Sequence, residues 1–253
     1  MENISKELLE KCETNPNEVN WVDISINQKL SEEFIEKFQE KVYWDWISAY
    51  QKLSEEFIEK FQEKVYWDYI SRYQKLSEKF IEKFQEKVNW DYISSSQKIS
   101  EEFIEKFQEK VNWICISKYQ KLSEEFINKH KLTIPESSWM YKDKEWKRKY
   151  IQENTKYEII NDKVIAYKSC RSDGYSAFNF QYYYEVGNEY ESHADYNSDN
   201  ENSFGLSAWT KEKAIEYYKG KLFRVEIGLE DIACIVHDGN KIRASRLRVV
   251  NNV

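Results

Sequence analysis

From Trp44 to Tyr66 the sequence reads WDWISAYQKLSEEFIEKFQEKVY. Close copies of this 23-residue text start at Trp21, Trp67, Trp90 and Trp113. Self-similarity at a fixed period in the twenties is typical of repeat proteins, whose units bury their apolar faces on one another because no unit has a complete core alone. We therefore predict an N-terminal α-solenoid of five 23-residue helical-hairpin repeats over residues 21–135.

Each copy predicts a short first helix, a tight bend and a longer second helix. In the copy quoted above, Ser54 can cap the N–H groups that begin the second helix, and the two glutamates that follow it favour the positive end of the helix dipole. The apolar residues that share one stripe of this helix are Phe57, Ile58, Phe61 and Val65. The first helix, from Trp44 to Gln51, is too short to be stable alone and depends on packing.

The copies differ mainly in the first helix, which we call helix A. Its third, sixth and seventh positions change from copy to copy and in several copies hold Trp, Tyr or a cation. Because Trp, Tyr and Arg are enriched in binding hot spots, we predict that helix A lines a protein-binding face. The alternative is drift at exposed positions combined with aromatic residues that fill the core. The candidate residues are Trp46, Tyr50, Tyr69, Arg72, Tyr73, Tyr92, Lys118 and Tyr119.

The array is bounded by irregular segments. Residues 1–20 keep some helical spacing and are predicted to form an N-terminal capping segment, since the end units of repeat arrays are atypical. In the fifth copy His130 stands where the other copies have Phe, and Pro135 follows, so we expect an exposed C-terminal cap. Residues 136–155 are predicted to be a linker, and residues 156–253 a separate domain.

The linker alternates cations with aromatic rings, a pattern that can hold single-stranded nucleic acid. Its candidate cations are Lys142, Lys144, Lys147, Arg148 and Lys149. Near the C-terminus a predicted strand adds a second basic group, made of Arg243, Arg246 and Arg248. The alternative for the linker is a solvated face between domains. The alternative for the strand is a charged edge, which discourages pairing between sheets.

The last domain has a β-rich composition that predicts a small α+β module. A helix is expected over residues 210–218, with Thr210 as its cap and Gly220 beyond its end. The expected strands cover 157–160, 163–169, 178–184, 222–227, 232–237 and 241–250, the last two joined by a hairpin turn at 238–240.

Five short motifs carry a resemblance to a known family. They are Tyr167–Arg171, Tyr184–Gly187, Asn202–Ser207, Ile232–Val236 and Lys241–Arg243. Together with the repeats they resemble a domain of unknown function at the C-termini of repeat proteins from giant viruses and bacteriophages. The resemblance implies a viral or prophage origin and a two-part build. It brings no catalytic residues.

The C-terminal module has two chemical alternatives, an enzyme and a metal site. The order of elements is loosely similar to ADP-ribosyltransferase folds, where Arg171, Ser207 and Glu226 would contact a nucleotide, although the diagnostic motifs are missing. A calcium loop starting at Asp195 would lack its required Gly and its bidentate Glu, so an Asx-rich loop is favoured. His193 and His237 lack the spacing of paired metal ligands and are expected to be ordinary loop or edge residues.

Composition limits the remaining classes of function. The net charge is −7, of which residues 1–135 carry about −6, so the array is a poor default for binding phosphates. The four scattered cysteines favour a reducing compartment, and neither a signal peptide nor a membrane-spanning stretch is visible. We predict a cytoplasmic protein, in the host cell if viral, without membrane association, cofactor or metal.

The sequence thus favours a non-enzymatic protein that binds a host or viral protein, with antagonism of a host defence factor as an extension suggested by acidity and the viral resemblance. The alternatives are an ADP-ribosyltransferase-like enzyme and a nucleic-acid-binding module.

Overall fold

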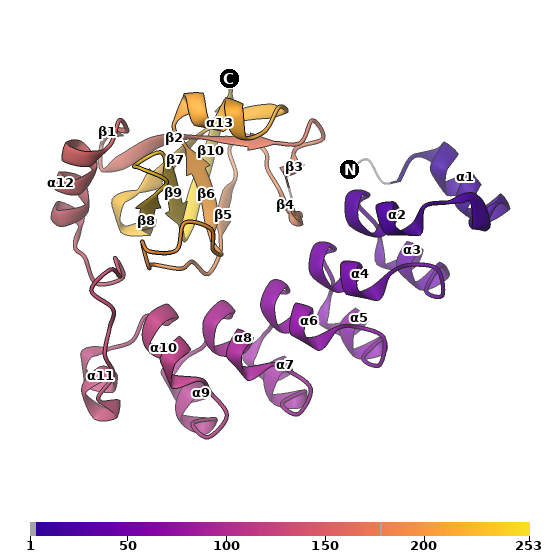
Figure 1. Ribbon diagram of the computed structural model, residues 1–253, viewed down its shortest axis with the longest axis horizontal. Helices are drawn as coiled ribbons and strands as arrows, with labels where there is room; N and C mark the ends of the chain where they lie inside the picture. The colour runs from indigo at the N-terminus through magenta and orange to yellow at the C-terminus, as the bar shows by residue number, and fades with distance from the viewer. Residues whose placement is uncertain (1–3, 178) are drawn as a thin grey trace. The chain divides into compact units, whose positions relative to one another are not determined.

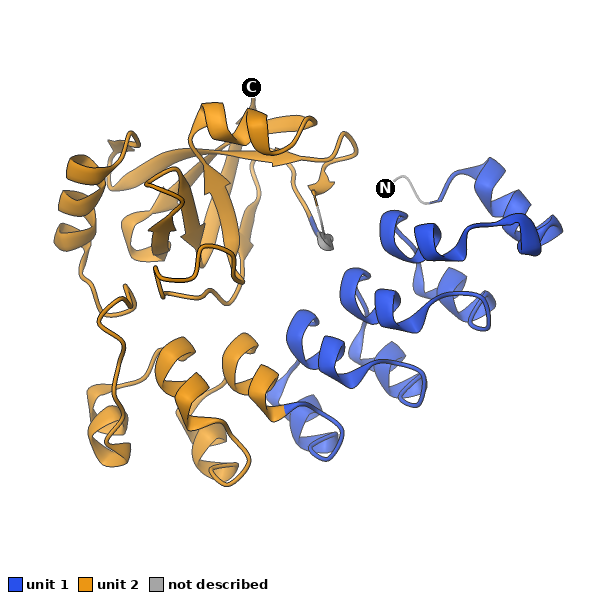
Figure 2. Ribbon diagram, in the orientation of Figure 1, with its two compact units in different colours: residues 1–89, 178–182 blue, residues 90–177, 183–253 orange. Residues whose placement is uncertain are grey.

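The computed structural model describes residues 4–177 and 179–253, without the side chains of 179–181. It divides into two compact units, coloured separately in Figure 2. Unit 1 comprises residues 1–89 and 178–182, and unit 2 comprises residues 90–177 and 183–253. The division falls inside the repeats, between the third and fourth copies. The predicted domain boundaries at residues 20, 135 and 155 stay predictions.

The repeats are helical, as predicted, and each copy contributes a pair of helices (Figure 1). Unit 1 contains α1 (Lys6–Thr14), a 3-10 turn (Pro16–Glu18), α2 (Trp21–Asn27), α3 (Glu32–Lys37), α4 (Trp44–Tyr50), α5 (Glu55–Lys60), α6 (Trp67–Tyr73) and α7 (Glu78–Lys83). Unit 2 begins with α8 (Trp90–Ser96), α9 (Glu101–Lys106), α10 (Trp113–Tyr119), α11 (Glu124–His130) and α12 (Lys144–Asn154).

The expected longer second helix was wrong. Helix α5 has six residues and α4 has seven. Ser54 caps α5 as predicted, because its hydroxyl accepts a hydrogen bond from the Phe57 N–H. Phe61 then leaves helical geometry, but the Val65 N–H still donates to the Phe61 carbonyl at 3.1 Å. This closing turn keeps the four-residue apolar spacing and therefore imitates a longer helix in the sequence.

Aromatic and aliphatic residues at constant repeat positions form the core of each copy. The Trp44 ring lies 5.1 Å from Phe61 and 6.2 Å from Phe57, measured between centroids. Ile47 and Ile58 are completely buried. The first helix and the second helix of one copy are thus held together by the tryptophan that opens each repeat.

Within each unit, a buried glutamine joins one copy to the copy before it. The Gln51 amide donates to the carbonyls of Ser25 (3.1 Å) and Gln28 (2.9 Å), and its oxygen accepts from the Leu30 N–H (3.1 Å). Gln74 in unit 1 makes the same three bonds one copy later, and Gln120 makes them within unit 2. These bonds satisfy backbone groups of the bend between two helices, which burial would otherwise leave unpaired.

The last copy has no following glutamine, and Tyr141 takes its place. The Tyr141 hydroxyl accepts from the Leu122 N–H at 3.1 Å and donates to the Leu122 carbonyl at 3.2 Å. In unit 2 the series of side-chain bonds to successive bends therefore ends with the hydroxyl of Tyr141.

The C-terminal module is an antiparallel sheet with one helix, which confirms the α+β prediction. Its main path runs β5-β10-β7-β2-β6-β9-β8, with β1, β3 and β4 beside it. The strands are β1 (Glu158–Ile160), β2 (Lys163–Cys170), β3 (Tyr175–Ser176), β4 (Asn179–Tyr183), β5 (Glu189–Glu191), β6 (Leu206–Trp209), β7 (Lys221–Gly228), β8 (Ile232–Val236), β9 (Lys241–Ala244) and β10 (Arg246–Asn252). Helix α13 (Lys211–Tyr217) packs on β2 and β6, and a 3-10 turn covers Leu229–Asp231.

The predicted strand over 241–250 was wrong, because the chain breaks at Ser245. The Ser245 N–H donates to the Asp231 carbonyl, and the Ser245 carbonyl accepts from the Ser192 N–H. Strand β9 lies between β6 and β8, and β10 lies between β5 and β7, so neither is the predicted edge. The β8–β9 hairpin is confirmed. Phe178, where the strand expected over 178–184 would start, lies outside the described residues.

The hydrogen bonds that Gln51, Gln74 and Gln120 make to the preceding copy, which we call the glutamine ladder, make a testable contribution to stability. Replacing Gln51 with alanine leaves the buried Ser25 carbonyl, the part-buried Gln28 carbonyl and the buried Leu30 N–H without their partner, and we expect a loss of about 3 kcal/mol in the free energy of unfolding. Urea denaturation followed by circular dichroism measures it. The matched control is Gln28→Ala, because Gln28 holds the same repeat position where no earlier copy precedes it. A control loss as large as that of Gln51→Ala would contradict the ladder.

Candidate functional site

Two helices A in unit 1 carry an exposed stripe of aromatic residues. In the second copy the stripe consists of Tyr43, Trp46 and Tyr50, which stand at i, i+3 and i+7 and so share one helix face. The third copy repeats it with Tyr66, Tyr69 and Tyr73. We call these six residues the helix-A aromatic surface.

The side chains of this surface are accessible to different degrees. Tyr43 is 47% exposed, Tyr66 55% and Tyr73 38%, whereas the other three are half-buried. Helix α4 packs directly against α6, so the two aromatic stripes are neighbours. Within each stripe the rings touch: Trp46 and Tyr50 are 5.8 Å apart, and Tyr66 and Tyr69 are 6.1 Å apart.

The first copy has a polar stripe at the same positions. It consists of Asn20, Asp23 and Asn27, which bond to one another: the Asp23 N–H donates to the Asn20 amide oxygen, and the Asn27 amide donates to the Asp23 carboxylate. In unit 1 the aromatic surface is therefore confined to the second and third copies. Identical packing positions and different stripe residues show that this face is not needed for stacking.

The flank formed by the second helices is different in character, because its charges are paired between copies. Lys60 contacts Glu36 at 2.5 Å, and Lys83 contacts Glu59 at 2.5 Å, each pair one repeat apart. These side chains are about half exposed, so each pair adds little stability. The pairing leaves this flank of unit 1 with partly compensated charge.

The predicted protein-binding residues fall into two groups. Trp46, Tyr50, Tyr69, Arg72 and Tyr73 lie on α4 and α6, and the Arg72 guanidinium stands over the Tyr73 ring at 5.1 Å. The remaining predicted residues are Tyr92, Lys118 and Tyr119, all in unit 2.

Tyr119 is engaged within unit 2. Its ring meets Phe204 of the C-terminal module edge-on at 5.6 Å, and burial raises the pKa of its hydroxyl. Sequence reasoning missed Tyr43 and Tyr66, which precede helix A. The signal was the last repeat position, which changes from Tyr in two copies to Asn in the next two.

The aromatic residues of the linker stack on one another. The Trp139 ring lies 5.1 Å from Trp146 and 4.7 Å from Tyr150, and Trp146 lies 5.3 Å from Tyr150. Trp139 is only 4% exposed. The three rings form a local core for the start of α12, which leaves less ring surface for bases than the sequence pattern suggested.

Lys147 does not belong to a surface patch, which corrects the prediction. It is 3% exposed, and its ammonium donates to the Ile232 carbonyl at 2.6 Å and to the Glu230 carbonyl at 3.4 Å. Strand β8 is the last strand of the main sheet path. Lys147 of helix α12 therefore supplies a hydrogen-bond donor to the Ile232 carbonyl of this edge strand and to the Glu230 carbonyl just before it. Burial lowers the Lys147 pKa to about 8.

The other linker cations are exposed or half-buried and have close contacts. Lys144 pairs with Glu230 at 3.2 Å, and Lys149 lies 3.9 Å from Glu153. Arg148 pairs with Asp162. The Lys142 ammonium stands over the Trp146 ring at 5.2 Å.

Arg243 is also buried and corrects a second nucleic-acid prediction. Its side chain is fully buried, lies 3.5 Å from the Asp195 carboxylate and donates to the Asp195 carbonyl at 2.9 Å. Arg246 and Arg248 are exposed, and Arg246 pairs with Glu191 at 2.7 Å. The basic strand predicted from 241–250 therefore does not form a single charged face.

The loop after Asp195 is held by Asx turns. The Asp195 carboxylate accepts from the Asn197 N–H at 2.8 Å, and the Asn197 side chain accepts from the Asp199 N–H at 2.9 Å. Asp195 itself is the counter-ion of Arg243. Across residues 4–177 and 179–253, no group of His, Cys, Asp and Glu is arranged to hold a metal ion.

The residues of the ADP-ribosyltransferase alternative are not brought together. Glu226 sits opposite Ile165 in β2, whereas Arg171 follows the far end of that strand and pairs with Asp173. Six residues of strand separate those two points, about 20 Å. Ser207 lies on β6, where its carbonyl accepts from the buried Lys168 ammonium at 2.8 Å.

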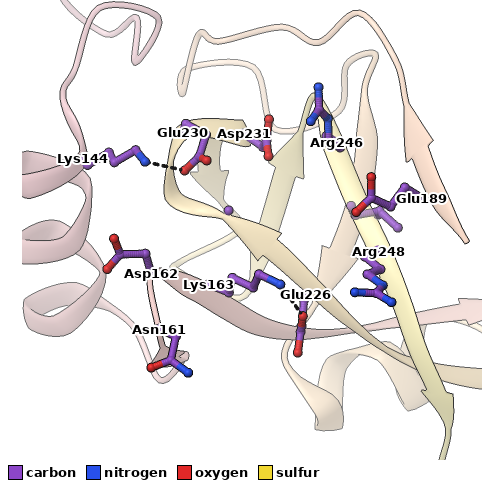
Figure 3. Close-up of a pocket in the computed structure, with 12 residues that line it drawn as sticks. Lys144, Asn161, Asp162, Lys163, Glu189, Glu226, Glu230, Asp231, Arg246 and Arg248 are labelled. Atoms are coloured by element: carbon purple, nitrogen blue, oxygen red, sulfur yellow. Dashed lines mark hydrogen bonds and ion pairs between the residues drawn. The ribbon is translucent and has the colours of Figure 1, made fainter. Parts of the chain in front are cut away.

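Glu226 instead lines a charged cavity of about 190 Å³ in unit 2 (Figure 3). The ion pairs Lys163–Glu226 (2.9 Å) and Lys144–Glu230 (3.2 Å) lie in its wall. The cations of these pairs are neutralised by protein carboxylates, so the cavity is mainly an ion-paired surface depression.

His130 differs from the expected exposed cap, whereas His193 lies in a loop as expected. His130 is half-buried rather than exposed: its ring stacks on Trp113 at 4.6 Å, and its Nε2 lies 2.7 Å from Glu105. His193 stacks on Phe204, and burial lowers its pKa to about 4. The His130 imidazole takes the position that Phe holds in the other copies and packs on the same tryptophan.

In the part of the chain that the structure describes, no helix combines the length and apolarity needed to cross a bilayer. In comparisons with known proteins, no family model matches the chain, and neither a curated protein nor a solved structure gives a significant match. The resemblance to giant-virus and phage repeat proteins stays a prediction.

The buried lysine predicts a pH dependence. Because the Lys147 pKa falls from 10.5 to about 8 on folding, between these values the unfolded chain holds a proton that the folded chain has released. Stability contributed by this group therefore rises with pH from about 8 to 10.5. Urea denaturation of the native protein and of Lys147→Met at pH 7.5 and 9.5 measures it. The native protein should gain stability relative to the variant at the higher pH, and parallel pH profiles would contradict the assignment.

Proposed function

We propose that the protein is a non-enzymatic binding protein that holds another protein on its helix-A aromatic surface. The observation that supports this most directly is the concentration of six Tyr and Trp residues on two neighbouring stripes, formed by α4, α6 and their N-caps, with three of the six more than a third exposed. Tyr and Trp dominate binding hot spots, because they bury much area with few rotatable bonds. Exposed apolar clusters of this kind mark interaction sites.

Folding does not account for this stripe. The packing residues of helix A lie on another face, where Ile47 and Ile70 are fully buried. The first copy keeps the same packing with Asn20, Asp23 and Asn27 in the stripe. Because a polar stripe in the first copy is compatible with the same packing, the aromatic residues of the second and third copies are available for a binding role.

An α-solenoid scaffold is part of the proposal. Its support is that the same glutamine bonds join neighbouring copies inside unit 1 and inside unit 2. A viral or phage source, and action against a host defence factor, extend the proposal on the sequence resemblance and the acidity of the repeats alone. Burial of Lys147 and Arg243 weakens the nucleic-acid alternative.

The test is affinity capture from cells that express the tagged protein, comparing the native chain with the Tyr43→Ala/Trp46→Ala/Tyr66→Ala/Tyr69→Ala variant. If the surface is the binding site, partners seen with the native chain should fall at least about tenfold with the variant, because hot-spot truncations cost about 2 kcal/mol each. Quantitative mass spectrometry gives the ratio.

The matched control is Tyr217→Ala on α13, since Tyr217 has the same 47% exposure as Tyr43. It should retain the partners. An unchanged set of partners with the fourfold variant, whose fold is verified by circular dichroism, would overturn the proposal.

A further inference from the structure

We propose that the occupant of the helix-A aromatic surface is a proline-rich, basic segment in the polyproline II conformation. This inference rests on the proposed function and specifies the chemistry of the partner. Three properties of the surface support it: the spacing of its two stripes, the unused polar groups on its rings, and the charge of unit 1.

The spacing of the stripes matches the polyproline II repeat. Helices packed as α4 is against α6 lie about 8–10 Å apart. A polyproline II segment has three residues per turn and rises about 3.1 Å per residue, so its side chains recur every 9.3 Å or so. A segment running across the helices can therefore present successive turns to the second and third copies.

The rings offer both apolar faces and hydrogen-bond donors. Among the described residues, no side-chain hydrogen bond is made by the hydroxyls of Tyr43, Tyr50, Tyr66 and Tyr69 or by the Trp46 indole N–H. A polyproline II backbone has no internal hydrogen bonds, so its carbonyls are available to such donors while proline rings pack on the aromatic faces. A segment that adds a strand would instead need a sheet edge, which helices α4 and α6 do not provide.

The charge of unit 1 favours a cationic occupant. Residues 1–89 carry a net charge of about −6, and Asp45 and Asp68 directly precede the third-position rings Trp46 and Tyr69 in the sequence. Arg72 already covers the Tyr73 ring, so the uncovered rings and the two carboxylates are the sites for a cation. Arginine or lysine between the prolines would meet these carboxylates and also the faces of the aromatic rings. An acidic segment would be repelled.

The test uses the full-length protein and three fluorescein-labelled peptides: four repeats of Arg-Pro-Pro, four of Arg-Gly-Gly and four of Glu-Pro-Pro. Fluorescence anisotropy at physiological salt measures binding. We expect saturable binding of the Arg-Pro-Pro peptide, about tenfold or more weaker binding of the flexible Arg-Gly-Gly peptide, and none of the acidic one. Equal binding of the two arginine peptides would overturn the conformational part, and no binding of Arg-Pro-Pro would overturn the proposal.

Variants locate the contact. Tyr43→Ala/Tyr66→Ala should weaken the Arg-Pro-Pro peptide about tenfold or more, whereas Tyr43→Phe/Tyr66→Phe, which keeps the rings, should weaken it less. Tyr217→Ala should bind as the native chain does, and an equal loss with Tyr217→Ala would place the peptide elsewhere. If this peptide fails while captured partners still depend on Tyr43 and Trp46, the choice of occupant is wrong and the protein-binding function stands. If both fail, the function fails too.

Discussion

Where two copies stack within one unit, the bend between the two helices of the first copy depends on a glutamine side chain of the second. In the pair joined by Gln51, one amide satisfies two carbonyls and one N–H that the helices themselves leave over. Such groups are costly when buried without a partner. A single copy therefore has neither a complete core nor a complete set of hydrogen bonds, and stacking supplies both.

This constraint divides the repeat positions into two classes. Positions that build the scaffold hardly vary: the glutamine that bonds to the neighbouring copy, the opening tryptophan that packs within its own copy, and the buried isoleucine. The stripe at the N-cap, third and seventh positions of helix A changes between polar and aromatic residues from copy to copy. Variation there changes the surface without changing the scaffold, and in two adjacent copies it produced a patch of aromatic rings with exposed donors. These positions can therefore adapt to a partner without altering the residues that hold the repeats together.

In unit 2 some cations that the sequence pattern assigns to the surface are buried and join elements of the fold. Lys147 closes carbonyls at the β8 edge, and Arg243 ties the loop after Asp195 to β9 through a fully buried ion pair. Removing one partner of such a pair would leave an uncompensated buried charge, which is far costlier than losing an exposed pair. The basic groups at 142–149 and 243–248 therefore divide into buried cations that join elements and exposed cations with nearby acids.

The sequence by itself determined the helical repeat, its period, the serine cap of each second helix and the α+β composition of the last module, because all of these follow from local periodicity and turn chemistry. It also indicated four of the six residues of the helix-A aromatic surface, namely Trp46, Tyr50, Tyr69 and Tyr73, through their variation between copies. Tyr43 and Tyr66 join them because each precedes helix A and shares the face of Trp46 or Tyr69. Only the tertiary structure decided that the chain breaks at Ser245, that Tyr141 ends the glutamine ladder and that Lys147 and Arg243 are buried. Each of these depends on contacts between residues distant in the chain, and a side chain's burial is set by what packs over it, which local spacing does not encode.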